Sequence, residues 1–290
     1  MQTVDRRTAI LTTGAAGLGL MVPGADALGE QPGARAVRNG RLRQSVSRWC
    51  YESIPLPEFC RAVAALGMTA IDLLEEPEWT VVRDHGLICS MGYGGGGTIE
   101  NGLNVRANHD TVVRNFEKSL PKAAALGVPN IITFFGNRRG MSDGEASDNC
   151  IAALNRIKPI AESTGVMVCV ELLNSKVDHK DYQGDRTPFG VQIVKAVDSP
   201  RVKLLYDIYH MQIMEGDLIR TIQDNHQRIA HYHTGGVPGR HELDATQEVN
   251  WPAVCTAIAA TGFTWFVAHE FVPTRDPLTS LRQAVTNCDV

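Results

Sequence analysis

The stretch "VKLLYDIYHMQIMEGD", residues 202–217, contains the pattern on which the fold prediction depends. It opens with a short, mostly apolar run that ends on Asp207, and His210 follows three residues later. Runs of this length and composition are typical of strands buried on both faces of a sheet. The acidic residue at the end has two explanations. It caps the next helix, or it is a ligand or catalytic group at the end of a buried strand.

The same pattern of a short apolar run followed by a helical segment recurs along the chain. The other predicted strands cover 44–49, 69–74, 87–92, 130–136, 166–172, 229–234 and 265–271. The predicted helices lie near 55–67, 76–86, 108–127, 143–164, 188–197, 214–226, 250–260 and 277–288, several of them ending at a glycine. Strict alternation of strand and helix predicts a parallel α/β sheet.

The number of units favours one closed barrel. Eight units over residues 44–290 fit a (β/α)₈ TIM barrel, a fold of typically about 250 residues. An open doubly wound sheet usually has G-x-G-x-x-G after its first strand, and no such motif follows Trp49. The glycine-rich stretch "GYGGGG" (92–97) has a different spacing, and we interpret it as a flexible loop at the active site.

Composition and charge favour a small-molecule partner. The chain has 290 residues, 43% hydrophobic content and a net charge of −4. No dense run of Lys and Arg indicates binding to nucleic acid or to a membrane surface. The seven cysteines show no C-x-x-C motif and no regular framework, so we expect them to be ordinary small apolar side chains.

The N-terminus has the layout of an export signal. Arg6 and Arg7 precede an uncharged run, 8–24, which is followed by the A-x-A pattern of residues 25–27. Paired arginines at this place indicate the twin-arginine route, and the run is too short and too rich in Gly and Ala for a good membrane span. We therefore predict a signal peptide at 1–27, a linker at 28–43 and a periplasmic or otherwise exported barrel, with a cytoplasmic protein as the alternative.

Four consecutive predicted strands end in a ligand-type residue. Glu171, Asp207, His233 and Glu270 stand at or near the ends of strands five to eight. In a (β/α)₈ barrel the C-terminal ends of the strands carry the active site. Burying three carboxylates together needs a counter-charge, and oxygen-rich ligation with one imidazole suits Mn²⁺, Mg²⁺ or Co²⁺. The sequence predicts one divalent metal ion bound by these four residues.

The loops after these strands contain polar residues that could hold a substrate. His210, Arg240 and Lys176 are the predicted substrate-binding residues, and Asn174, His179, His241 and Glu242 are further polar groups in these loops. Lys180, Asp181 and Asp185 are expected to be solvated loop charges.

A metal ion and two carboxylates together suggest a proton-transfer reaction on a carbonyl compound. A bound metal stabilises the negative charge that develops on enolisation of a carbonyl compound, and Glu171 and Glu270 can move a proton between adjacent carbons or between faces. This combination predicts an aldose–ketose type isomerisation or an epimerisation next to a ketone.

The motifs "ELLNSKVDHKDY" (171–182), "YDIYHMQIMEGDLIRTI" (206–222), "HYHTGGVPGRHELD" (231–244) and "VAHEFVPTRDP" (267–277) closely resemble the hydroxypyruvate isomerase family within the xylose isomerase-like barrels. The resemblance covers roughly 44–290. It implies one divalent metal, an acid/base pair matching Glu171 and Glu270, a metal aspartate matching Asp207, and interconversion of hydroxypyruvate and tartronate semialdehyde or a related small hydroxy-carbonyl compound.

One position departs from that family. The third-strand ligand is often Gln in hydroxypyruvate isomerases, whereas this chain has His233, as the ketose 3-epimerases do. In those epimerases a histidine and an arginine similar to His210 and Arg240 contact the substrate. Together with the export signal, this similarity keeps an exported sugar or keto-sugar 3-epimerase as the alternative function.

Two further classes of function are a non-catalytic periplasmic sugar-binding barrel and a metal-dependent endonuclease on the same barrel. Pure binding does not need two opposed acid/base groups, and the pI of about 6.1 argues against binding to DNA. We expect no nucleic-acid partner and no stable membrane span, and a homo-oligomer is compatible with the sequence.

Overall fold

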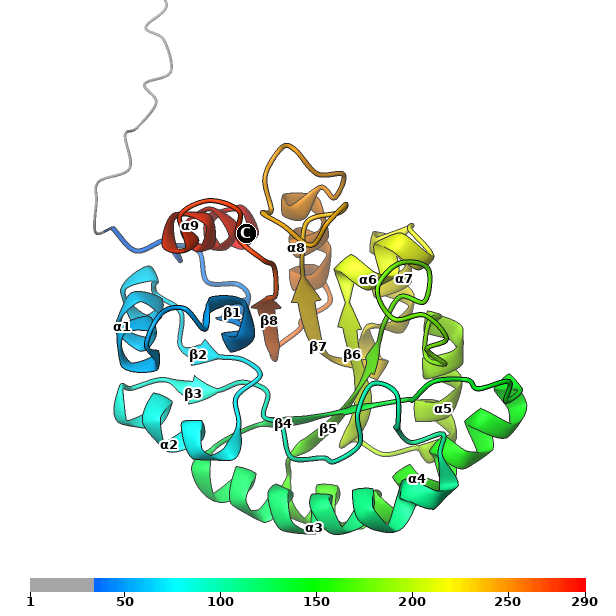
Figure 1. Ribbon diagram of the computed structural model, residues 1–290. Coiled ribbons are helices and arrows are strands. Elements are labelled where there is room, and N and C mark those ends of the chain that lie inside the picture. The colour runs from blue at the N-terminus through cyan, green and yellow to red at the C-terminus, as the bar shows by residue number, and fades with distance from the viewer. Residues whose placement is uncertain (1–33) are drawn as a thin grey trace, which may run out of the picture. The chain divides into compact units, whose positions relative to one another are not determined.

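The computed structural model describes residues 34–290, which form a barrel of parallel strands surrounded by helices (Figure 1). Six strands pair in the order β1-β8-β7-β6-β5-β4, and β2 pairs with β3. Isolated parallel bridges connect the two sets, from Ser47 to Asp72 on one side and from Gly92 to Ile131 on the other. These bridges close the ring, and the predicted (β/α)₈ barrel is confirmed.

The observed elements follow the predicted alternation. The strands are β1 (Arg43–Val46), β2 (Ala70–Ile71), β3 (Ile88–Cys89), β4 (Asn130–Phe134), β5 (Met167–Leu172), β6 (Val202–Asp207), β7 (Ile229–Thr234) and β8 (Phe266–His269). The α-helices are α1 (Leu56–Leu66), α2 (Glu76–Asp84), α3 (His109–Leu126), α4 (Asp143–Thr164), α5 (Thr187–Val197), α6 (Ile208–Met214), α7 (Leu218–Asn225), α8 (Trp251–Ala260) and α9 (Pro277–Cys288).

Two predictions of local structure were wrong in their extent. The predicted helix at 214–226 begins four residues late, at Leu218 of α7, and a helix that was not predicted, α6, precedes it, with the turn between the two in "MEGD" (214–217). Gly216 and Asp217 both have positive φ, 65° and 43°, a conformation that interrupts a right-handed helix. Strands β2 and β3 are also much shorter than the predicted runs 69–74 and 87–92.

The barrel interior has its own apolar cluster, separate from the larger core. Cys169 and Leu205 belong to it, on β5 and β6. Side chains two positions apart on a strand share a face, so Glu171 and Asp207 face the barrel interior directly above these residues. The fold thereby carries the acidic side chains to one end of the barrel axis.

The glycine-rich stretch 92–97 packs closely against the barrel wall. Gly92 bridges to residues on both sides of it. A Cβ atom at Gly95 would lie 2.4 Å from the Cζ of Phe116 and 2.7 Å from the backbone oxygen of Ile132. Glycine is required at this position because the backbone passes close to α3 and β4.

The described part of the predicted linker, residues 34–43, is packed on the barrel. Ala36 and Leu42 are buried, and the carboxylate of Asp289 accepts hydrogen bonds from the backbone N–H groups of Arg38, Asn39 and Gly40 at 2.6–2.8 Å. The predicted signal peptide at 1–27 lies outside the described residues.

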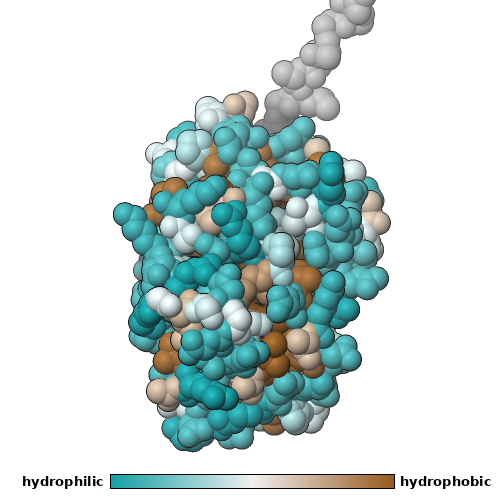
Figure 2. Space-filling model, turned by 90° about the vertical axis from the view of Figure 1, so that its right-hand side faces the viewer, coloured by the Kyte–Doolittle hydropathy of each residue, from teal (hydrophilic) through white to brown (hydrophobic). Residues whose placement is uncertain are grey.

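The surface and the cysteines match a globular barrel. Figure 2 shows one side of the molecule as mostly hydrophilic, with small apolar patches. All seven cysteines are free, and six of them are buried, as expected for small apolar side chains. Among the described residues, no helix is both long enough and apolar enough to cross a membrane.

Candidate active site

The four predicted ligand residues meet at the C-terminal end of the barrel. Glu171 lies in β5, Asp207 ends β6, His233 lies in β7 and Glu270 directly follows β8. One ligand atom from each side chain can be chosen so that all four lie within 4.8 Å of one another, and all four residues are buried. The cluster forms because Asp207 pairs in register with His233 on neighbouring, continuously bonded strands.

The imidazole of His233 is oriented for ligation. Its Nε2 lies 2.9 Å from Asp72 Oδ2. A carboxylate can only accept, so Nε2 carries the hydrogen and Nδ1 faces the cluster. Nδ1 lies 2.5 Å from Glu270 Oε2 and 3.4 Å from Glu171 Oε1, yet it has no hydrogen bond of acceptable geometry in the described chain.

The close spacing of these hydrogen-bond acceptors favours binding of a cation. Burial alone lowers the pKa of His233, but the neighbouring carboxylates of Glu270, Asp72 and Glu171 raise it well above its usual value. The unpartnered, buried nitrogen and the three carboxylates around it are a donor set of oxygens and one imidazole nitrogen, which divalent ions such as Mn²⁺ favour. A carboxylate on the far ring nitrogen is the usual support of a metal-binding histidine.

The guanidinium of Arg240 is a positively charged group of the protein that contacts this cluster. Its Nη2 donates to Asp207 Oδ2 at 2.7 Å and to Glu270 Oε2 at 2.5 Å. Its Nη1 donates to His210 Nε2 at 2.8 Å. Because a guanidinium only donates, His210 accepts here and is neutral, in agreement with a pKa that burial and then Arg240 lower well below the usual value.

Asp207 is both a helix cap and a member of the cluster. Its Oδ1 accepts from the backbone N–H of His210 at 3.1 Å and so caps α6. Its Oδ2 faces the cluster and pairs with Arg240. One carboxylate therefore starts the helix with one oxygen and takes part in the site with the other.

The two glutamates have opposite electrostatic environments. Burial raises the pKa of Glu171 to about 7, against the effect of His233. Burial also acts on Glu270, but His233 and Arg240 outweigh it and hold the pKa of Glu270 well below its usual range. Two carboxylates whose pKa values are pushed apart are the arrangement expected of an acid and a base in one site.

A cavity of about 350 Å³ opens beside the cluster at the barrel mouth. Four of the candidate site residues line it, Glu171, Glu270, His210 and Arg240. The rest of its lining is Trp49, Leu73, Tyr93, Ile99, Ile132, Phe134, Leu173, Asp178 and His179. Such a cavity lies within the range of small-molecule sites, about 300–1,000 Å³.

Two residues of the site were not predicted from the sequence. Asp72 orients His233, and Trp49 Nε1 donates to Glu270 Oε1 at 2.5 Å. Asp72 interrupts the apolar run 69–74 as Asp207 ends its own run, so the same signal was present in the sequence. No such signal marks Trp49, because its contact with Glu270 depends on the pairing of β1 with β8 when the barrel closes.

Several predicted or considered residues have other contacts. Lys176 Nζ donates to the backbone oxygens of Ile213 and Met214 and does not line the cavity. Glu242 is buried and accepts from Thr274 and Ser280. The expectation that Asp185 is a solvated charge is wrong, because it is buried.

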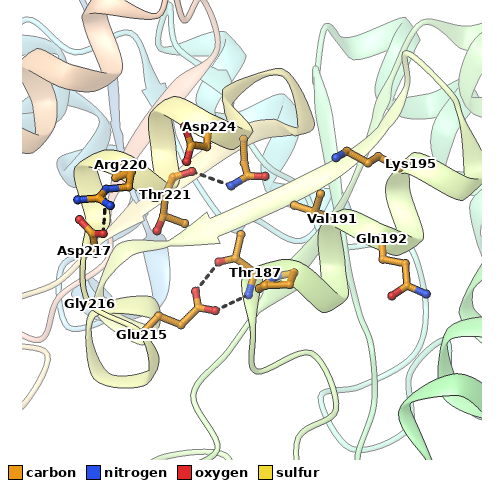
Figure 3. Close-up of a pocket in the computed structure, with 12 residues that line it drawn as sticks. Thr187, Val191, Gln192, Lys195, Glu215, Gly216, Asp217, Arg220, Thr221 and Asp224 are labelled. Carbon is orange, nitrogen blue, oxygen red and sulfur yellow. Dashed lines mark hydrogen bonds and ion pairs between the residues drawn. The ribbon is translucent and has the colours of Figure 1, made fainter.

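A larger hollow lies elsewhere, on the outside of the barrel between α5 and α7 (Figure 3). Its volume is about 630 Å³. Its polar groups bind one another: Glu215 accepts from the N–H and hydroxyl of Thr187, and Arg220 pairs with Asp217. None of the four cluster residues lines this hollow, so we place the candidate active site at the barrel mouth.

Comparison with known sequences identifies the family of the chain. A family model described as xylose isomerase-like TIM barrel matches residues 60–286. A 2-oxo-tetronate isomerase of Pectobacterium atrosepticum is 25% identical over 238 residues, 77% of this chain and 88% of the relative. A human protein named provisionally as a hydroxypyruvate isomerase is 26% identical over 250 residues, 80% of this chain and 90% of the relative.

Solved structures show the same fold. A family 2 AP endonuclease of Brucella melitensis superposes with a TM-score of 0.75 at 23% identity, covering 83% of this chain and 97% of the other. D-psicose 3-epimerase of Clostridium cellulolyticum, solved with D-tagatose, has a TM-score of 0.64 at 19% identity and covers 84% and 90%. A protein named IOLI, solved with a bound zinc atom, has a TM-score of 0.65 at 13% identity and covers 85% and 95%.

Proposed function

The chain belongs to the xylose isomerase-like TIM barrel family, and we propose that it is a divalent-metal-dependent isomerase that moves a proton between neighbouring positions of an α-hydroxy-carbonyl compound. The observation that carries this proposal is the cluster of Glu171, Asp207, His233 and Glu270 at one end of the barrel. Its relatives are named isomerases, in agreement with this class of reaction.

The four cluster residues would hold the ion, which we propose to be Mn²⁺, Mg²⁺ or Co²⁺. When bound, such an ion stabilises the negative charge that develops on the substrate oxygens during enolisation. Asp72 keeps His233 in the tautomer whose Nδ1 faces the cluster. The burial of all four side chains excludes bulk water from the place where charge develops.

Glu171 and Glu270 would carry the proton. Glu270, with a lowered pKa, is the anionic partner, and Trp49 fixes one of its oxygens. Glu171, with a pKa of about 7, can exist in either form near neutral pH, as a group that accepts and returns a proton must. His210 and Arg240 line the cavity next to this pair and are the proposed contacts to the substrate oxygens.

Two reactions use this arrangement. The names of the relatives favour interconversion of hydroxypyruvate and tartronate semialdehyde, or of a related 2-oxo acid. The second candidate is 3-epimerisation of a keto-sugar. His233 at the third ligand position favours it, and so does the likeness to D-psicose 3-epimerase.

Proton exchange tests the proposal whatever the product. The protein is stripped with a chelator, loaded with Mn²⁺ and incubated in D₂O with small hydroxyketones and 2-oxo acids, and deuterium uptake is followed by NMR. We expect uptake with metal and none after chelation. Glu270→Gln and Glu171→Gln should lose it, whereas Glu117→Gln, on the exposed face of α3, should not.

Full exchange by metal-free protein, or near-native exchange by both cluster variants, contradicts the proposal. A non-catalytic sugar-binding barrel would bind ligand in calorimetry but give no exchange under any of these conditions.

We also propose that the protein is exported through the signal at 1–27, with the paired arginines Arg6 and Arg7 as the recognition element. Cell fractionation of the full chain and of a variant with both arginines replaced by lysine tests this. A shortened chain outside the cytoplasm is expected for the native sequence only. An intact N-terminus in the cytoplasm for both forms contradicts it.

A further inference from the structure

The glycine-rich stretch 92–97 carries a single side chain, that of Tyr93. The three glycines at 94–96 pass close to one face of helix α3. A Cβ atom at each of them would lie closer than 3.0 Å to a side chain of that helix, those of Ser119, Phe116 and Asn115. The glycines therefore let the backbone pass the helix, and Tyr93 is the residue through which this stretch can contact a ligand with a side chain.

Backbone hydrogen bonds place Tyr93 at the mouth of the barrel. Its N–H donates to the carbonyl oxygen of Leu74 at 3.0 Å. The preceding residue, Gly92, donates to the carbonyl oxygen of Asn130 at 2.9 Å and accepts from the N–H of Ile132 at 3.1 Å. The ring of Tyr93 packs on the apolar cluster of the barrel interior, and the residue lines the cavity beside the carboxylate cluster.

Tyr93 reaches this cavity from the side opposite the carboxylate cluster. In the closed ring, β3 stands four strands away from β7, which holds His233. The lining residues that lie on or after β2, β3 and β4 are Leu73, Tyr93, Ile99, Ile132 and Phe134. Tyr93 is the one residue among these five whose side chain has a polar group. A substrate oxygen on this side of the cavity therefore has one side-chain partner.

The hydroxyl of Tyr93 is available for such a contact. It has no hydrogen-bond partner in the described chain, whereas the hydroxyls of Tyr182 and Tyr209, at the same end of the barrel, donate to protein oxygens. Burial raises the pKa of Tyr93 far above neutrality, so the hydroxyl keeps its proton. A protonated hydroxyl both donates and accepts, which matches the hydrogen-bonding capacity of another hydroxyl.

The geometry points to Tyr93 as a substrate-binding residue, whose hydroxyl bonds to a substrate hydroxyl beyond the two reacting carbons. The reacting carbons must lie near Glu171 and Glu270, the proposed proton-transfer pair, so the rest of the substrate extends toward the β2–β4 side of the cavity. This inference rests on the proposed function, because it assumes that the cavity beside the cluster holds the substrate.

Two pairs of compounds isolate the contact. Dihydroxyacetone and L-erythrulose are ketones with three and four carbons, and hydroxypyruvate and 3,4-dihydroxy-2-oxobutanoate are the corresponding 2-oxo acids. In each pair the longer compound bears a hydroxymethyl group in place of one hydrogen of the shorter compound. Deuterium uptake from D₂O is measured for all four compounds with the Mn²⁺-loaded full chain, as the native protein and as Tyr93→Phe.

Removing the hydroxyl should affect the longer compounds selectively. Tyr93→Phe should raise KM for the longer compound of a pair by about 3–10-fold, the effect of one hydrogen bond between uncharged groups. The value of kcat should stay nearly the same, because a contact away from the reacting carbons is equally strong in the ground state and the transition state. Both constants for the shorter compound should stay at their native values.

Tyr51→Phe is the matched control for this substitution. The buried hydroxyl of Tyr51 has no hydrogen-bond partner in the described chain, and Tyr51 does not line the cavity. The same chemical change at this position should leave the kinetics of all four compounds as they are.

A second variant tests whether the glycine-rich stretch places Tyr93. The methyl group of Gly95→Ala would press on Phe116 and on the backbone oxygen of Ile132, so the segment must move and take the tyrosine with it. KM for the longer compound should rise, and adding Tyr93→Phe to this variant should raise it less than in the native protein. Gly144→Ala, where a Cβ atom meets nothing within 4 Å, is the control.

The outcomes separate this inference from the proposed function. Equal losses for both compounds of a pair in Tyr93→Phe, no loss for the longer compound, or uptake by native protein from the shorter compounds only, each overturns the inference and leaves the isomerase intact. Uptake from none of the four compounds overturns the proposed function itself, and the inference with it.

Discussion

Asp72 Oδ2 accepts a hydrogen bond from His233 Nε2 over 2.9 Å, although the two residues are 161 positions apart in the chain. The other oxygen of Asp72 accepts from Ser90 Oγ at 2.5 Å and lies 3.1 Å from His231 Nε2. All of these groups are buried. The network determines which nitrogen of His233 faces the carboxylate cluster, and the proposed metal site therefore depends on a residue outside it.

Replacing Asp72 should weaken metal binding. Asp72→Ala removes the acceptor of the His233 N–H, and Asp72→Asn keeps an acceptor but removes its charge. Calorimetric titration with Mn²⁺ should show affinities falling in the order native, Asn variant, Ala variant, with a total loss of about 10–100-fold. Ser90→Ala, which leaves the partner of His233 in place, is the control. Native affinity in a folded Asp72→Ala protein would show that Asp72 does not orient the ligand.

The indole N–H of Trp49 should matter for catalysis more than for binding. Trp49→Phe keeps an aromatic side chain, although a smaller one, and removes the donor to Glu270 Oε1. Since Trp49 is 39% exposed, water can replace part of this bond, and we expect kcat to fall by about 3–10-fold with little change in KM. Trp251→Phe is a matched control, because the buried Trp251 Nε1 has no hydrogen-bond partner in the described chain. An equal loss in both variants would mean that the effect is not specific to Glu270.

Arg240 should stabilise the metal-free protein more than the metal-loaded one. Arg240→Gln leaves Asp207 and Glu270 without their paired cation, so Tm in the presence of chelator should fall by several degrees. Added Mn²⁺ should restore more of the lost stability than it adds to the native protein, since the ion neutralises the same carboxylates. Arg220→Gln, an exposed pair with Asp217, should change neither value. Equal effects of Mn²⁺ on the Arg240 variant and on native protein would contradict this.

The carboxylate of Glu242 should make the free energy of unfolding depend on pH in the acid range. Burial opposes its charge, but hydrogen bonds from Thr274 and Ser280 lower its pKa from 4.5 to about 2. A lowered pKa means that the stabilisation is present above about pH 4.5 and is lost as the pH falls toward 2. Glu242→Gln should reduce the free energy of unfolding at pH 7 by about 1–3 kcal/mol and flatten its change between those pH values. Glu248→Gln, on an exposed side chain, should leave the denaturation curves as they are.

The barrel could be predicted from the sequence because the alternation of strand and helix patterns is periodic and local. Strands β6 and β7 were predicted to the residue, and helix α4 likewise. The ends of β2 and β3 were not, because pairing in a closed barrel depends on how distant strands meet. Helix α6 was not predicted, because it follows β6 directly, and the turn that separates it from α7 depends on the backbone conformation of Gly216 and Asp217.

The site was predicted where a residue type and a strand end coincide. Glu171, Asp207, His233 and Glu270 satisfy both conditions, and the structure brings them together. Lys176 satisfies neither condition, since it lies in a loop whose conformation no local sequence pattern determines. Trp49 could not be found from its own segment, because its contact with Glu270 joins the first strand to the last.

The two sides of the barrel differ in how continuously neighbouring strands are hydrogen-bonded. The cluster residues lie on or beside β5 to β8, which are joined by continuous ladders, while Leu73 and Tyr93 follow the two-residue strands β2 and β3. Backbone segments with few cross-strand bonds open more readily, so the amides near β2 and β3 should exchange with solvent faster than those of β5 to β7. The carboxylates of the cluster are thus held on the side of the ring with continuous strand pairing. Leu73 and Tyr93 line the cavity from the side with few cross-strand bonds, so this part of the lining can shift without moving those carboxylates.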